Sequence, residues 1–101
     1  MLKISIRPFH ESDAMEVYTM LKGTEELQVG GLTYSEKAVQ GWHVTRTQDT
    51  ILIAETETAI MGFIAAKLND PEPGAAYIDC LVVKSEYRGR GIGQQLFKQC
   101  I

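Results

Sequence analysis

The chain has 101 residues, a formal net charge of −3 at pH 7, and a composition that is 45% hydrophobic and 23% charged. This length and composition predict one small globular domain over residues 1–101. No apolar run approaches the roughly 20 residues that cross a membrane, and the amino terminus shows no signal-peptide pattern. The acidic balance gives no overall attraction to nucleic acid or anionic lipid. We therefore expect neither nucleic acid nor a membrane as a partner.

The amino-terminal half is predicted to contain one strand and two helices. Residues 3–9 alternate apolar and polar side chains, which is typical of a short strand. Apolar residues at helical spacing predict a helix over Asp13–Lys22. Residues 24–34 have no period and are interpreted as a loop. A second helix is predicted over Ser35–Gln48, although Gly41 weakens it.

Three strands are predicted to follow, over residues 50–55, 60–68 and 75–83. Short polar connections separate them, so an antiparallel arrangement is the default. Gly62 inside the second of these strands indicates a bulge or a close approach of another backbone. The fold class expected is α/β of the α+β type, with a mixed, mostly antiparallel sheet and the order strand, helix, helix, strand, strand, strand, helix.

The segment from Tyr77 to Ile101 combines a buried strand, a basic glycine-rich connection and the start of a helix. Gly89, Gly91 and Gly93 alternate just before the helix. The first N–H groups of a helix lack internal partners and lie at the positive end of its dipole, so such a turn can hold an anion. The apolar face predicted for this helix consists of Leu96, Phe97 and Ile101.

The spacing of these residues is specific. The run Arg88-Gly89-Arg90-Gly91-Ile92-Gly93 fits the pattern Arg/Gln-x-x-Gly-x-Gly/Ala. With Leu81-Val82-Val83 before it and Ile6-Arg7-Pro8 near the amino terminus, it resembles the acetyl-coenzyme A site of the GCN5-related N-acetyltransferase (GNAT) superfamily. A dinucleotide fingerprint fits poorly, and a P-loop is excluded because no Gly-Lys-Ser/Thr is present.

The resemblance implies an acyl-CoA N-acyltransferase-like fold and transfer of an acetyl group from acetyl-CoA to a primary amine by direct attack. Acetyl-CoA is then a co-substrate, the acceptor is a small-molecule or peptide amine, and no metal is expected. The positions implied to bind the coenzyme are Leu81, Val82, Val83, Arg88, Gly89, Arg90, Gly91, Ile92 and Gly93.

Asp79 is the leading candidate for the general base, because it is a carboxylate in an otherwise apolar strand and burial would raise its pKa. A structural aspartate bonded to backbone N–H groups at a bulge is an equally good interpretation. Glu25 and Glu26 could attract a cationic amine, or could be solvated surface charges. Superfamily members commonly use a tyrosine from a later part of the domain as the general acid, so no residue here is assigned that role.

The two cysteines, Cys80 and Cys100, make neither a disulfide framework nor a zinc-binding spacing. Cys80 has apolar neighbours and no evident base, and direct transfer needs no nucleophilic thiol. We interpret both as buried free thiols, which favours a reducing, cytoplasmic compartment.

Superfamily members normally continue with further strands and another helix. The resemblance therefore implies that these residues are the amino-terminal part of the domain, with the carboxy-terminal elements missing. The strand Ala75–Val83 would then lie at the edge of the sheet, and we expect a second copy or a second chain to cover it. The alternative function is a non-catalytic CoA-binding module, or an inactive truncated fragment that needs a second chain to complete the fold.

Overall fold

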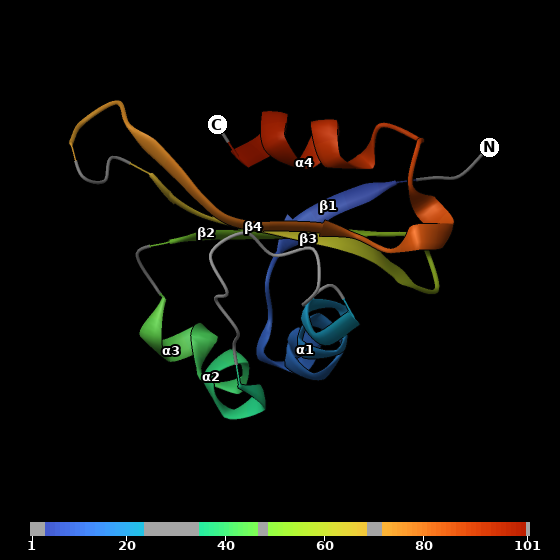
Figure 1. Ribbon diagram of the computed structural model, residues 1–101, viewed down its shortest axis with the longest axis horizontal. Coiled ribbons are helices and arrows are strands. Elements are labelled where there is room, and N and C mark those ends of the chain that lie inside the picture. Colours follow the sequence, from blue (N-terminus) through green and yellow to red (C-terminus); the bar gives the residue numbers. More distant parts are fainter. Residues whose placement is uncertain (1–3, 24–34, 47–48, 69–71, 101) are drawn as a thin grey trace.

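The computed structural model describes residues 4–23, 35–46, 49–68 and 72–100. Figure 1 shows one central sheet with helices α1, α2 and α3 on one face and helix α4 on the other. The elements in chain order are β1 (Ser5–Pro8), η1 (Glu11–Asp13), α1 (Ala14–Gly23), α2 (Glu36–Gln40), α3 (Trp42–Thr45), β2 (Thr50–Glu55), β3 (Ile60–Leu68), β4 (Ala76–Val83), η3 (Ser85–Tyr87) and α4 (Ile92–Cys100). The predicted fold class is confirmed.

The strands lie in the order β1-β2-β3-β4, so each strand pairs with its neighbour in sequence. All three pairings are antiparallel. β1 is short and lies at one edge, where its last residue, Pro8, is opposite Leu52. A proline at this position removes no bond from the interior of the sheet. β4 lies at the other edge of the described sheet, as the sequence predicts.

The sheet buries an apolar layer on each face. Val17, Trp42 and Phe63 belong to the layer between the sheet and α1–α3. Ile64, Ile92 and Leu96 belong to the layer beneath α4. Burying one such side chain contributes about 1.5–3 kcal/mol, so the two layers hold the helices against the sheet. The helices that the structure describes include none long and apolar enough to cross a membrane.

Helix α4 buries Leu96, as the sequence predicts, but it does not bury Phe97. Its buried residues are Ile92, Leu96 and Cys100, which recur every four residues. Phe97 is expected on the buried face, but its side chain is 45% exposed. Burial of Ile92 and Leu96 turns Phe97 away from the sheet, because neighbouring residues on a helix point about 100° apart. Ile101 lies outside the described residues.

The predicted helix over Ser35–Gln48 is interrupted at Gly41. The Ser35 hydroxyl accepts from the Ala38 N–H at 3.1 Å and caps α2. Gly41 has φ −87° and ψ −3°, and α3 begins after it. Glycine loses more backbone entropy in a helix than other residues do, and ψ at Gly41 departs from the value of about −42° in a regular helix. Residues 47 and 48 lie outside the described part of the chain.

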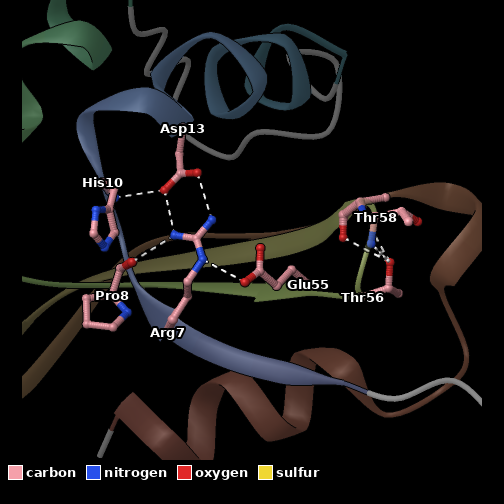
Figure 2. A network of polar contacts seen from close by, with 8 residues as sticks. Arg7, Pro8, His10, Asp13, Glu55, Thr56 and Thr58 are labelled. Atoms are coloured by element: carbon pink, nitrogen blue, oxygen red, sulfur yellow. Dashed lines mark hydrogen bonds and ion pairs between the residues drawn. The ribbon is translucent and has the colours of Figure 1, made fainter.

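A network of charged groups joins β1, β2 and the start of α1 (Figure 2). The guanidinium of Arg7 donates to both carboxylate oxygens of Asp13, at 2.8 and 2.9 Å, and its Nε donates to Glu55 at 2.8 Å. The His10 N–H also donates to Asp13, at 2.8 Å. The hydrogen bonds from Arg7 hold the pKa of Asp13 below its usual range, although burial of this carboxyl opposes the shift. The network fixes the entry of α1 against the sheet.

Candidate functional site

The candidate site lies where β4 ends and the chain turns into α4. Gly62 of β3 is opposite Val83, the last residue of β4. A Cβ atom at Gly62 would lie 2.5 Å from the carbonyl oxygen of Val82, so the two strands approach more closely here than a residue with a side chain allows. The Lys84 N–H donates to the Met61 carbonyl at 2.8 Å. The end of β4 is therefore held firmly against β3.

Asp79 lies at an irregularity in β4. Ala65 is opposite Cys80 and Ala66 is opposite Ile78, so Asp79 is the extra residue of a bulge. This placement fits the structural interpretation of Asp79 and does not test its role as a base. The side chain of Asp79 lies outside the described part of the chain, and its role in catalysis stays a prediction.

Because of the bulge, the side chains of β4 after Asp79 alternate between the two faces of the sheet in a shifted order. Val82 packs in the layer under α1, and Cys80 packs against the same layer. Val83 packs in the layer under α4, and Leu81 lies on that face as well, since its Cδ2 is 3.8 Å from the position of a Cβ at Gly93. Leu81 is nevertheless 42% exposed. It therefore offers an accessible apolar side chain on the edge strand, close to the start of α4.

The connection from β4 to α4 is a tight turn. The Tyr87 N–H donates to the Lys84 carbonyl at 2.9 Å, and the Arg88 N–H donates to the Ser85 carbonyl at 3.3 Å. Gly89 and Gly91 then adopt φ of +80° and +77°. A Cβ at either glycine would meet no atom within 4 Å, so the backbone conformation rather than lack of space requires glycine.

The turn leaves a series of backbone donors without acceptors. Among the described residues, the N–H groups of residues 89–94 have no hydrogen-bond partner, and the first bonded one is that of Gln95, which donates to Gly91 at 3.1 Å. These donors surround the amino terminus of α4, where the helix dipole is positive. Such an array suits a diphosphate, which offers several anionic oxygens.

The two arginines of the turn behave differently. Both are exposed, but the Nε of Arg88 donates to the carbonyl of Val83 at 3.0 Å. Arg90 makes no such bond to any part of the chain that the structure describes. From sequence alone the two are equivalent sources of positive charge, because no local pattern indicates a bond from a side chain to a strand carbonyl.

A second contact that the sequence does not indicate joins the site to α1. The Lys84 ammonium and the Glu16 carboxylate are 2.6 Å apart. Glu16 and Lys84 are 68 positions apart, so no local spacing could pair them. Glu25 and Glu26, the two candidates for amine binding, lie outside the described residues.

The described residues also include two cysteines and several side chains of metal-binding type. Neither Cys80 nor Cys100 forms a disulfide; Cys100 is buried as predicted, whereas Cys80 is only half-buried. Burial raises the pKa of the Cys100 thiol. Within the described ranges, no three His, Cys, Asp or Glu side chains come together in a way that could hold a metal ion.

The described sheet is antiparallel, and its strand β4 leads through a glycine turn to the amino terminus of α4, an arrangement that matches the acyl-CoA N-acyltransferase-like fold. The family model described as "Acetyltransferase (GNAT) family" matches residues 13–101, and the chain belongs to that family. The resemblance stated from the residues is thereby confirmed.

Solved structures with the same fold include several acetyltransferases. The chain is 22% identical to an acetyltransferase from Thermus thermophilus, with a TM-score of 0.73 and 97% of this chain covered. It is 22% identical to the diaminobutyrate acetyltransferase of Paenibacillus lautus, which is bound to L-2,4-diaminobutyric acid and coenzyme A (TM-score 0.81, 99% covered). It is 20% identical to a GNAT family acetyltransferase of Brucella melitensis in complex with acetyl-CoA (TM-score 0.73, 98% covered).

The chain spans 67%, 57% and 66% of the lengths of these three structures. No curated protein matches it.

Proposed function

We propose that this chain supplies the coenzyme-binding part of an N-acetyltransferase, which moves an acetyl group from acetyl-CoA to a primary amine. The observation that supports the proposal is the row of N–H groups over residues 89–94, which have no hydrogen-bond partner in the described part of the chain and lie between the edge strand of the described sheet and the amino terminus of α4. The two glycines with positive φ keep side chains away from this row. A diphosphate fits there, and the neighbouring guanidinium of Arg90 adds positive charge.

The free edge of β4 is proposed to hold the pantetheine arm. Leu81, Val82 and Val83 have backbone groups along this edge, which can pair with the amides of an extended ligand as a further strand would. The exposed side chain of Leu81 offers apolar contact at the same place. Backbone N–H groups of this segment would then lie near the thioester carbonyl, where negative charge develops.

The proposed step is direct transfer. The lone pair of the neutral amine attacks the thioester carbon, the C–N bond forms, and the C–S bond breaks. Asp79 is proposed to accept the amine proton, directly or through water. The leaving thiolate takes a proton from a group that we do not assign to any residue of this chain.

The proposal also extends to the acceptor amine, to a second chain and to the cellular compartment. A small amine is a reasonable acceptor because one similar structure contains L-2,4-diaminobutyric acid. We also propose that a second copy or a second chain covers the part of the β4 edge that the coenzyme leaves open, since an eight-residue edge strand with exposed apolar side chains is prone to associate. The two cysteines form no disulfide, which favours the cytoplasm as the compartment of this proposal.

Calorimetric titration with acetyl-CoA tests the proposal. Saturable one-site binding that competes with free coenzyme A supports it, and absence of binding by a folded chain contradicts a preformed site. Release of free thiol on adding an amine then separates an enzyme from the alternative, a non-catalytic CoA-binding module. Mass in solution, measured by gel filtration with light scattering, tests the covering of the β4 edge by a second copy.

A further inference from the structure

The side chain of Arg88 returns to the point where its own turn begins. Its Nε donates to the carbonyl oxygen of Val83 at 3.0 Å. The N–H of the same peptide group, that of Lys84, donates to Met61 at 2.8 Å. The peptide group that ends β4 is therefore held at both its oxygen and its nitrogen, once by the turn and once by β3.

This double attachment sets the direction in which the chain leaves the strand. Val83 is the last residue of β4, and the row of free N–H groups begins at residue 89, directly after Arg88. The bond between Nε and Val83 therefore joins the strand to the residue that precedes the row. Without it, two backbone bonds close the turn, and one of them, from Arg88 to Ser85, is long at 3.3 Å.

We propose that Arg88 is a positioning residue that shapes the row of donors through its Nε–H, whereas Arg90 acts as a counter-charge. The part that concerns coenzyme affinity rests on the proposed function; the part that concerns the turn does not. Both side chains are exposed, but of the two only Arg88 is bonded within the part of the chain that the structure describes.

The identity of the donor atom makes the proposal testable. The bond uses Nε, which follows three side-chain carbons. The amide nitrogen of glutamine also follows three carbons, so Arg88→Gln keeps an N–H donor in place and removes the charge. Lysine has a methylene at that place, so Arg88→Lys keeps the charge and removes the donor. The same two replacements at Arg90 form a matched control.

The experiment measures the dissociation constant of acetyl-CoA by calorimetry for the wild type and these four variants, at low and high salt. We expect Arg88→Gln to bind within about 2-fold of wild type and Arg88→Lys to bind about 5- to 10-fold more weakly, as loss of one hydrogen bond predicts. At position 90 we expect the opposite order, with Arg90→Gln weakening binding and reducing its salt dependence.

Three results for acetyl-CoA affinity would overturn the proposal. Arg88→Lys could bind as tightly as wild type while Arg88→Gln binds more weakly, both variants could bind as tightly as wild type, or both could lose the same affinity. If the wild type does not bind acetyl-CoA, the proposed function fails, and amide hydrogen exchange in the free protein still decides the role of Arg88. We expect faster exchange of the Tyr87 and Arg88 N–H groups in Arg88→Lys and wild-type rates in Arg88→Gln. Unchanged exchange in Arg88→Lys would also overturn the proposal.

Discussion

Gly62→Ala tests whether the close approach of β3 and β4 holds the end of the candidate site together. A Cβ atom at this position would lie 2.5 Å from the carbonyl oxygen of Val82 and 3.1 Å from the Cα of Val83. Both are backbone atoms, so no side-chain rotation can relieve the contact. The two strands must separate at the end where β4 passes into the turn.

The expected cost follows from that geometry. Adding one methyl group to a well-packed interior typically destabilises a protein by about 1–3 kcal/mol. Because the obstructing atoms belong to the backbone, we expect about 2–3 kcal/mol, equivalent to a fall in Tm of about 10–20 °C for a domain of this size. Urea unfolding followed by circular dichroism measures the change in the free energy of unfolding.

Gly41→Ala is the matched control. A Cβ at Gly41 would be 3.6 Å from its nearest neighbours, an ordinary contact, and φ there is negative. This variant should be stabilised by about 0.4–1 kcal/mol, because alanine restricts the unfolded chain. If the free energy of unfolding of Gly62→Ala lies within about 0.5 kcal/mol of the wild-type value, the strands adjust freely and the reasoning is refuted.

Three further predictions concern the turn, the acid side of the stability curve and the base. Gly91→Val should abolish acetyl-CoA binding, because φ of +77° strains a β-branched residue. Gly93→Ala should bind normally, since its Cβ would make contacts of 3.8 Å or more. A calorimetric affinity for Gly91→Val equal to or higher than that for Gly93→Ala contradicts this prediction. Folding lowers the pKa of Asp13, so the stability that its carboxylate contributes is complete above about pH 3.9 and is lost as the pH falls through the pKa of the folded state. Asp13→Asn should lower the free energy of unfolding by about 2–3 kcal/mol at pH 7 and should reduce the loss of stability at acid pH, measured by urea unfolding. An unaltered dependence of stability on acid pH argues against the pairing of Asp13 with Arg7. Asp79→Asn should lower turnover more than coenzyme affinity, and an unchanged pH–rate profile would remove Asp79 as the base.

The features that can be predicted well from the sequence are those set by local patterns. Runs of apolar residues such as 60–68, separated by short polar or Gly- and Pro-rich turns, predict consecutive antiparallel strands. The alternating glycines predict the turn, and two of them do adopt positive φ. Gly62 is predicted to mark a bulge or a close approach, and the approach is confirmed, because a Cβ placed at Gly62 would lie only 2.5 Å from the carbonyl oxygen of Val82.

The features that cannot be predicted from the sequence depend on residues that meet only in the folded chain. The Lys84–Glu16 ion pair and the bond from Arg88 to Val83 have no signature in local spacing. Ile92 is buried and Phe97 is exposed because of how α4 packs across the sheet, and the sequence of the helix alone does not determine that packing. Asp79 is at a bulge because the register shifts between Ala65 and Ala66, and register is a property of both strands.

The sequential strand order has a consequence for the folding pathway. β2, β3 and β4 are joined by short connections and can pair early, since closing a short loop costs little chain entropy. β1 pairs with β2 only after the whole segment from Phe9 to Asp49 is brought together, so we expect it to dock late. The Arg7 network, which needs β1, β2 and α1 in place, would then form near the end of folding. Substitutions there should speed unfolding while leaving the refolding rate almost unchanged.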